Sequence, residues 1–319
     1  MGHQNIVLTM QFYPVKDSLR LITAGEDLCI RVWDLVINKE VVCLRGFMGR
    51  ITSLAFSNDH KTLIVGAKDG RISFYNAADN YRQIAVMDVV KDMNIPNPLS
   101  DQDLEVNALC YITTTKQGLF LAVGTNAGQL ALVDLRTQKV CFLEAEFIAS
   151  EIVHIFYDES EQRLFAVNQD QNLFTYELKL KKSGVKLNKV ASKCLFLDEL
   201  IDIKFMKQLN SDGHASESKY AIMCSNSETL KLYNMMTGDV ELYHGHDDII
   251  LCIDTHARPG EPTLVLTGAK DNTVRLWTFD PERKFQHRLS CLAVFKGHTE
   301  NISGVCFAPK KREFFASVG

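Results

Sequence analysis

The chain has 319 residues, and its 35 Lys and Arg nearly balance its 39 Asp and Glu, giving a formal net charge of −4. This balance excludes nucleic-acid binding through bulk charge, although it leaves room for local basic patches. No run of about 18 apolar residues occurs, so the sequence predicts no membrane-spanning helix. Its nine cysteines form no CxxC pair, a pattern that favours reduced thiols in the cytosol or nucleus.

A Gly-His pair followed by an apolar run is the first recurring element along the chain. It occurs at Gly2-His3, Gly245-His246 and Gly297-His298, and Gly46-Phe47 fits the same frame. Self-similarity of this kind is the sequence signature of a repeat architecture, and it takes precedence over any element-by-element interpretation.

A second recurring element follows the first, and it combines Thr, Asp and Trp at a constant spacing. Asp comes four residues after Thr, and Trp comes ten residues after Thr, in two strong copies. The copies are Thr23, Asp27 and Trp33, then Thr267, Asp271 and Trp277. Weaker copies keep the ten-residue spacing and end at positions 75, 133, 176 and 233.

The closing positions recur about every 43 residues, and longer insertions separate two of the copies. A period of ~40–45 residues is typical of a four-stranded propeller blade. Short runs of alternating apolar and polar residues between Gly, Asp and Asn also indicate strands. The sequence therefore predicts an all-β propeller, with six complete four-stranded blades over 1–295. The third strands of these blades are expected at 28–34, 70–76, 129–135, 171–178, 228–234 and 272–278.

Residues 296–319 are expected to supply only the first two strands of a seventh blade, Ile302–Phe307 and Phe314–Val318. Ser317 holds the Thr position, so the Asp of the repeat would come two residues after Gly319. We therefore expect a truncated chain in which the outer edge of the second strand has no partner.

The recurring His, Thr, Asp and Trp are the residue types that form one polar chain inside a blade. Asp in a turn can accept from His, His can donate to the Thr hydroxyl, and that hydroxyl can accept from the indole N–H. The sets His246, Thr267, Asp271, Trp277 and His3, Thr23, Asp27, Trp33 carry this pattern. A catalytic role for Asp and His is disfavoured, because a motif repeated in several blades indicates architecture.

His244, His246 and Asp248 also resemble the HxHxD element with which hydrolases hold zinc. The repeat already accounts for His246, and the residue after Asp248 is Ile249. The sequence contains no phosphate-binding loop and no nucleophile elbow. We therefore predict no catalytic, cofactor-binding or metal residue, no cofactor and no small-molecule substrate.

Gly-His and Trp-Asp are the signature of WD-repeat (WD40) propellers, and the chain resembles that family throughout. From about residue 200 it resembles more closely the WD-repeat proteins of the UtpB subcomplex of the small-subunit processome. The segments that carry this likeness are Ile201–Phe205, Cys224–Tyr233, Tyr243–Ile250, Ala269–Trp277, Gly297-His298 and Glu313–Phe315. The most specific part is the Ser-Asn-Ser turn at 225–227, which is followed by His-Gly-His at 244–246.

The resemblance implies a non-catalytic scaffold for ribosomal RNA processing and small-subunit assembly in the nucleolus. Its implied partners are other processome proteins and the backbone of pre-ribosomal RNA. The alternative is a WD-repeat adaptor of another complex, such as a ubiquitin-ligase substrate receptor or a signalling platform. The family has two tandem propellers, so the chain is expected to cover parts of both.

Three basic connections are candidates for partner binding. Strands A to D of a blade are antiparallel, so A–B and C–D connections are expected on one face. Basic loops there could follow a phosphate backbone or an acidic partner. The candidates are Lys181, Lys182 and Lys186 in blade four, Arg283 and Lys284 in blade six, and Lys310, Lys311 and Arg312 in blade seven.

The insertion 88–104 is acidic and lies in a D–A connection, on the opposite face. Because Pro96, Pro98 and few core-type residues occupy it, we expect a mobile segment that is dispensable for folding.

Overall fold

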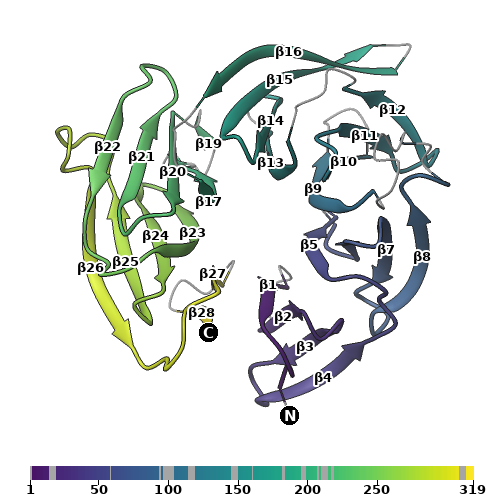
Figure 1. Cartoon of the computed structure of the whole chain (residues 1–319), viewed down its shortest axis with the longest axis horizontal. Helices are drawn as coiled ribbons and strands as arrows, with labels where there is room; N and C mark the ends of the chain where they lie inside the picture. Colours follow the sequence, from purple (N-terminus) through teal and green to yellow (C-terminus); the bar gives the residue numbers. More distant parts are fainter. Residues whose placement is uncertain are drawn as a thin grey trace. The chain divides into compact units, whose positions relative to one another are not determined.

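A computed structural model shows that the ordered elements of this chain are all β-strands (Figure 1). The structure describes residues 2–13, 19–57, 59–92, 95, 104–113, 119–144, 150–159, 161–181, 184–194, 199–206, 208–209, 215–216, 219–308 and 314–319. No helix among these residues is long and apolar enough to cross a membrane.

The chain divides into two compact units, and each unit takes residues from near the start of the sequence. Unit one contains 1–5 and 23–197, and unit two contains 6–22 and 198–319. The first sheet lies near the start of the sequence. Its strands, in order, are β1 (Val7–Phe12), β2 (Arg20–Gly25), β3 (Ile30–Asp34) and β4 (Lys39–Leu44).

Three further four-stranded antiparallel sheets lie wholly in unit one. The second sheet has β5 (Ile51–Phe56), β6 (Thr62–Ala67), β7 (Arg71–Asn76) and β8 (Arg82–Asp88). The third has β9 (Val106–Thr113), β10 (Leu119–Thr125), β11 (Leu130–Asp134) and β12 (Lys139–Leu143). The fourth has β13 (Ile152–Asp158), β14 (Arg163–Asn168), β15 (Asn172–Lys181) and β16 (Gly184–Cys194).

Unit two contains the remaining sheets. The fifth sheet has β17 (Leu200–Phe205), β20 (Tyr220–Ser225), β21 (Leu230–Asn234) and β22 (Val240–Tyr243), and the hairpin β18 (Gln208–Leu209) with β19 (Ala215–Ser216) interrupts its first connection. The sixth has β23 (Ile250–Arg258), β24 (Glu261–Ala269), β25 (Thr273–Phe279) and β26 (Leu289–Lys296). A two-stranded sheet follows, with β27 (Gly304–Phe307) and β28 (Phe315–Val318).

These sheets confirm the predicted fold class of a β-propeller with six four-stranded blades and two strands of a seventh. The predicted third strands correspond to β3, β7, β11, β15, β21 and β25. Strand pairing shifts register by a β-bulge beside the closing aromatic residues Trp33, Tyr75, Tyr176 and Trp277. The repeat therefore specifies a local backbone feature as well as a side chain.

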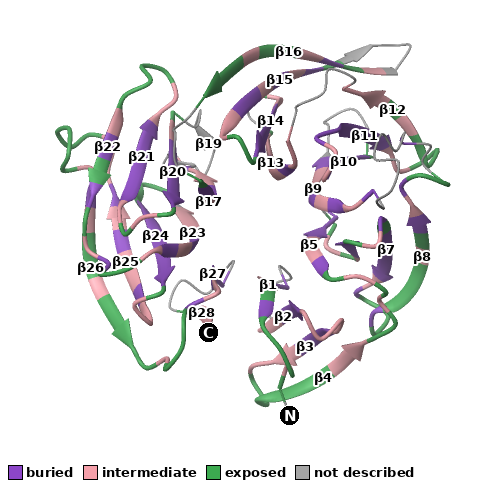
Figure 2. Cartoon of the chain, viewed as in Figure 1, coloured by how far each residue is buried: buried purple, intermediate pink, exposed green. Residues whose placement is uncertain are grey.

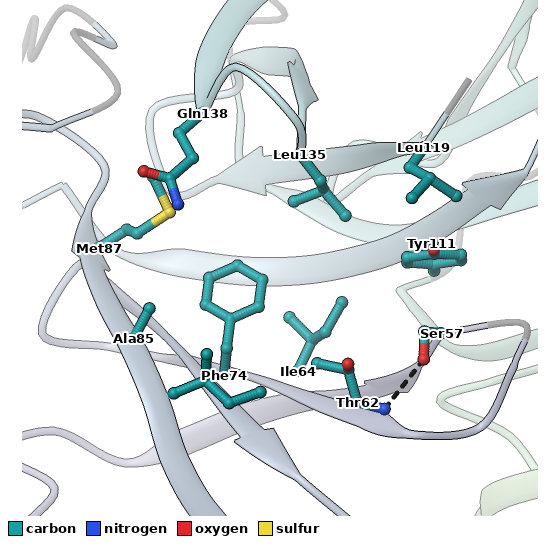
Figure 3. A pocket seen from close by; sticks show the side chains of 11 residues that line it. Ser57, Thr62, Ile64, Phe74, Ala85, Met87, Tyr111, Leu119, Leu135 and Gln138 are labelled. Carbon is teal, nitrogen blue, oxygen red and sulfur yellow. Dashed lines mark hydrogen bonds between the residues drawn. The ribbon is translucent and has the colours of Figure 1, made fainter. Parts of the chain in front are cut away.

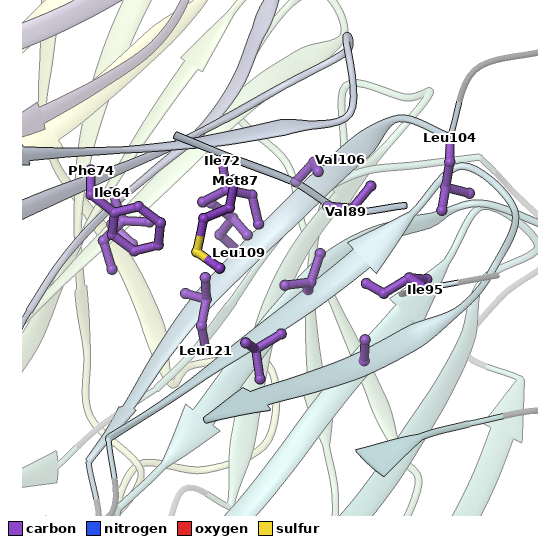
Figure 4. Packing of buried hydrophobic residues seen from close by; sticks show 14 residues of the cluster. Ile64, Ile72, Phe74, Met87, Val89, Ile95, Leu104, Val106, Leu109 and Leu121 are labelled. Carbon is purple, nitrogen blue, oxygen red and sulfur yellow. The ribbon is translucent and has the colours of Figure 1, made fainter. Parts of the chain in front are cut away.

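The core lies between successive sheets of a unit. In unit one, one cluster joins the second and third sheets (Figure 4) and another joins the third and fourth. In unit two, clusters join the fifth sheet to the sixth and the sixth to β27 and β28. The fourth strands β4 and β8 are the most exposed of their sheets (Figure 2). Neighbouring faces thus bury the apolar side chains, which is the main source of stability for such sheets.

The expectation that 88–104 holds few core residues is wrong for its described part. Val89, Ile95 and Leu104 are buried in the cluster between the second and third sheets. Val89 N–H donates to the Gly70 carbonyl (2.9 Å), and Ile95 N–H donates to the Val89 carbonyl (2.9 Å). Gly70 has a φ of +73°, and a Cβ there would lie 2.5 Å from the Leu104 carbonyl oxygen. Residues 93–94 and 96–103, which include Pro96 and Pro98, lie outside the described residues.

Candidate functional site

The predicted polar chain forms in the sixth sheet. The Trp277 indole N–H donates to Thr267 Oγ1 at 2.9 Å, and that oxygen lies 2.7 Å from His246 Nε2. His246 Nδ1 lies 2.8 Å from Asp271 Oδ2. The indole is therefore linked to the carboxylate by consecutive hydrogen bonds, as the spacing of the residue types predicts.

The direction of the His–Thr bond differs from the expected one. Burial lowers the pKa of His246, although the hydrogen bond to Asp271 opposes this, so the buried ring is neutral and has a single N–H. The Asp271 carboxylate can only accept, so Nδ1 carries the hydrogen. Nε2 must then accept, and the Thr267 hydroxyl is the donor.

Asp271 is held by four donors. Thr273 supplies its hydroxyl at 2.7 Å and its N–H at 2.9 Å, and the Asp247 N–H and His246 complete the set. Burial raises the pKa of Asp271, but these hydrogen bonds outweigh burial and the net shift is downward. The carboxylate is thus ionised and fully used in fixing the turn before β25.

The same chain forms in the first sheet. Thr23 Oγ1 lies 2.7 Å from His3 Nε2 and accepts from Trp33 Nε1 at 2.8 Å. His3 Nδ1 lies 2.9 Å from Asp27, which also receives the Gln4 N–H and lies 3.7 Å from the Arg31 guanidinium. A shortened version joins the segment before β27 to β28, where His298 Nε2 lies 2.8 Å from Ser317 Oγ.

The polar chain of the sixth sheet is buried, which indicates a structural role. Thr267 is fully buried and the His246 side chain is 0% exposed, so no substrate can reach either group. His246 is also committed to Thr267 and Asp271, and cannot serve the HxHxD pattern. Among the described residues, no group of three His, Cys, Asp or Glu side chains is arranged to hold a metal ion.

The structure describes only part of the predicted basic connections. Lys186 is exposed on β16, where it lies directly opposite Lys179 of β15. Arg283 and Lys284 are exposed in the connection between β25 and β26. The side chain of Lys181 and the residues Lys182, Lys310, Lys311 and Arg312 lie outside the described residues.

Charge in the connection between β25 and β26 is more balanced than the sequence indicates. Arg283 lies 3.4 Å from Asp280 and donates to Ser290 Oγ at 3.1 Å. Arg288 forms an ion pair with Glu241, whose side chain is only 3% exposed. Lys284 therefore carries the least compensated positive charge of this connection.

Two aspartates on the first strands of the fifth and sixth sheets accept backbone hydrogen bonds from the sheet that follows, a feature that the sequence patterns did not reveal. Asp202 accepts the N–H of Ile253 at 2.8 Å, and Asp254 accepts the N–H of Phe307 at 2.7 Å. Lys204 lies 3.7 Å from Asp202, which raises the pKa of the lysine. Each aspartate thus fixes the first strand of the next sheet, across more than 50 residues of sequence.

Comparison with known proteins agrees with this geometry. Residues 16–192 match the family described as "Nucleolar protein 10-like, N-terminal domain", and 239–278 and 289–319 match "WD domain, G-beta repeat". Transducin beta-like protein 3 of Rattus norvegicus is 24% identical over 99% of this chain, and that of Homo sapiens is 23% identical over 99%. Coronin-7 of Rattus norvegicus is 37% identical over 24% of the chain.

The aligned region is a minor part of these relatives. This chain covers 36% of the rat and 41% of the human transducin beta-like protein 3, and the coronin-7 match covers 8% of that protein. The chain therefore spans well under half the length of the curated relatives that it matches.

Proposed function

Because the chain belongs to the WD-repeat β-propellers of the nucleolar protein 10-like family, we propose that it is a non-catalytic scaffold for ribosomal RNA processing and small-subunit assembly in the nucleolus. The observation that carries the proposal is the match to the nucleolar protein 10-like domain over more than half of the chain. The similarity to part of transducin beta-like protein 3 over 99% of this chain and the resemblance of residues 200–319 to UtpB WD-repeat proteins support the same role.

The absence of catalysis is part of the proposal, and the buried polar chains support it. Asp271, His246 and Thr267 resemble a catalytic triad in residue type, but their hydrogen bonds are all used within one sheet. A nucleophile needs an approach path for its substrate, which the fully buried Thr267 lacks. Binding through exposed surfaces is therefore the activity that the fold supports.

We place the partner contacts of this scaffold on its A–B and C–D connections. Lys186 and Lys284 are exposed there. Lys179 and Lys186 are paired directly across β15 and β16, and Glu177 lies 2.9 Å from Lys179 and compensates its charge. Lys186 and Lys284 are the exposed charges for which a partner would have to supply an anion. A ribosomal RNA backbone or an acidic segment of a processome protein would supply that anion.

The test is to replace the eight candidate basic residues with Glu and recover the tagged protein from cells. The residues are Lys181, Lys182, Lys186, Arg283, Lys284, Lys310, Lys311 and Arg312. Exposed charges contribute little to stability, so the variant should fold. We expect loss of processome proteins and pre-ribosomal RNA from the purified complex. If RNA is contacted directly, each lost contact should reduce the logarithmic salt slope by roughly 0.7 for single strands.

A matched control carries Glu at exposed basic residues of the opposite connections, namely Arg71 and Lys270. This variant should keep its processome partners. Recovery of ubiquitin-ligase or signalling proteins in place of processome proteins with the unmodified chain would contradict the nucleolar role and favour an adaptor of another complex.

A further inference from the structure

An open cavity lies between the second and third sheets of unit one (Figure 3). Its volume is about 240 Å³, and apolar side chains from both sheets line it. Ile64, Phe74 and Met87 come from the second sheet, and Tyr111, Leu119 and Leu135 come from the third. We call this cavity the β8–β9 pocket.

The β8–β9 pocket is the place where the core between these sheets opens to solvent. Deeper in the interface, the cluster is closed by Ile72, Leu109 and Leu121 (Figure 4). Phe74 faces Ala85 across β7 and β8, next to a β-bulge. The small Ala85 side chain leaves unfilled the space that a larger residue would occupy.

The pocket continues into an exposed apolar surface along β8. Ile84 lines the pocket and is 60% exposed, and Leu119 at the pocket is 37% exposed. β8 is an edge strand, the last of its sheet. An extended segment could therefore lie along β8 while one of its side chains enters the pocket.

Polar groups of the pocket are few. Gln138 lies toward the end that holds Met87, whereas Ser57 and Tyr111 lie toward the other end (Figure 3). Ser57 Oγ is already engaged, since it donates to Asp59 at 2.6 Å and accepts the Thr62 N–H at 3.0 Å. An apolar occupant fits this lining better than a polar one.

Arg82 is an exposed cation on β8, the strand that supplies Ile84, Ala85 and Met87 to the pocket. Arg82 pairs in register with Asn76, which places it on the face of β8 that also carries Ala85. Within the described residues, no carboxylate forms an ion pair with Arg82. Asp79, in the turn before β8, accepts the Arg82 backbone N–H through its carbonyl at 2.9 Å and forms no ion pair with the guanidinium. Two acids beside pocket-lining residues are engaged elsewhere, since Asp59 accepts the Ser57 hydroxyl and the Lys61 N–H, and Asp134 accepts the Arg136 N–H at 2.9 Å. Arg82 is thus available for a carboxylate of a partner.

We propose that the β8–β9 pocket binds one large apolar side chain, aromatic or branched aliphatic, from an extended acidic segment of a partner protein, with Arg82 contacting a carboxylate of that segment. Drug-sized ligands occupy cavities of about 300–1,000 Å³, so this smaller cavity suits a single side chain. Buried aromatic or aliphatic anchors of this kind dominate many protein interfaces. The proposal goes beyond the scaffold function, because the pocket would bind such a segment in any complex.

Met87 provides a reporter inside the pocket. The 319-residue chain with ¹³C-labelled Met methyl groups would be titrated with synthetic eight-residue peptides, and the Met87 resonance assigned with Met87→Leu. One peptide has a central Phe between Asp and Glu residues, a second replaces Phe with Ser, and a third replaces the acids with Lys. We expect a saturable shift of the Met87 methyl resonance with the first peptide only.

Two variants test the contacts separately, and a third fills the pocket. Arg82→Glu should weaken binding of the acidic Phe peptide about tenfold, because it places like charges together. Ile84→Ser removes an exposed apolar side chain, so it should fold normally and weaken binding as well. Ala85→Leu should fill the pocket and abolish the Met87 shift.

The variants Ile84→Ser and Arg82→Glu each have a matched control in unit one. Val190→Ser alters a fourth-strand residue of the same exposure (59%), and Arg71→Glu reverses an exposed charge at the start of β7. Both controls should bind the peptide like the parent. The proposal is overturned if no peptide shifts Met87, if the Lys peptide binds as well as the acidic one, or if the controls weaken binding as much as Ile84→Ser and Arg82→Glu.

Discussion

Arg288 and Glu241 form an ion pair that joins two sheets of unit two across 47 residues of sequence. Glu241 also accepts the Tyr243 hydroxyl at 2.7 Å and the Gln286 N–H, and the Arg288 guanidinium lies over the Tyr220 ring at 5.5 Å. The connection that carries Arg283 and Lys284 is therefore fixed to β22 by a nearly buried charge. Because this connection is already ordered in the folded protein, a partner that binds it would not have to order it on binding.

Arg288→Ala should destabilise the protein by about 3 kcal/mol, because it leaves the Glu241 carboxylate buried without its cation. Urea denaturation measures the loss. The control is Arg283→Ala in the same connection, whose exposed pair with Asp280 should contribute roughly 0–1 kcal/mol. Equal losses in the two variants would show that the Arg288 pair is not a buried anchor.

Trp277→Ala should cost on the order of 3–5 kcal/mol, since the indole is 3% exposed and its removal leaves a cavity. Trp277→Phe keeps an aromatic ring but loses the donor to Thr267 and part of the buried volume, so its cost should be smaller than that of Trp277→Ala. Thermal unfolding of both variants checks this order. Trp33→Ala, at the less buried equivalent in the first sheet, should be milder than Trp277→Ala. A Trp277→Ala protein as stable as the parent would refute the structural role of this residue.

Stability should fall on acidification below about pH 6.5, the ordinary pKa of His. Burial lowers the folded-state pKa of His246, so the unfolded chain binds more protons in this window and is stabilised relative to the folded chain as the pH falls. Asp271 adds to the loss at still lower pH, because its folded pKa also lies below the ordinary value. Above the ordinary pKa of each group, its contribution to the free energy of unfolding is fully present.

Denaturation at pH 7.5 and 5.5 measures the first part of this dependence. The difference between the two pH values should shrink in His246→Gln. The exposed neighbour His244 provides the control, and His244→Gln should retain the parent's difference. An unchanged difference in His246→Gln would assign the pH dependence to other groups.

Ile95→Ala should destabilise the protein by about 2–4 kcal/mol, because Ile95 is 1% exposed within the cluster of the second and third sheets. Val90→Ala, in the same connection but 37% exposed, should change stability by less than about 0.5 kcal/mol. Differential scanning calorimetry of the pair checks this contrast. If Ile95→Ala matched Val90→Ala, the connection 88–104 would be dispensable after all.

The sequence allowed the blades and their polar chains to be predicted because both depend on local spacing. Thr267, Asp271 and Trp277 lie within one pair of adjacent strands, and ten residues bring Trp277 back beside Thr267. The direction of the His246–Thr267 bond could not be predicted in the same way. It depends on the burial of the imidazole, which neighbouring strands determine.

The remaining features arise from packing between sheets, which no local pattern records. Glu241 and Arg288 belong to successive sheets, and Asp202 reaches a backbone N–H 51 residues away. Val89, Ile95 and Leu104 were obscured by the acidic, proline-containing composition around them. The β8–β9 pocket requires the position of Ala85 opposite Phe74 and the approach of the third sheet, neither of which the repeat specifies.

Unit two consists of two separate stretches, and this has a consequence for synthesis on the ribosome. Met10 of β1 packs against Gly304 of β27, where a Cβ would lie 3.2 Å from the Met10 methyl carbon. Residues 6–22 are translated before 198–319, so β1 must wait for β27 while the intervening residues are translated, which takes on the order of ten seconds. The nascent chain would expose the apolar residues of β1 throughout that interval, and chaperones would have the opportunity to bind there before the last sheets form.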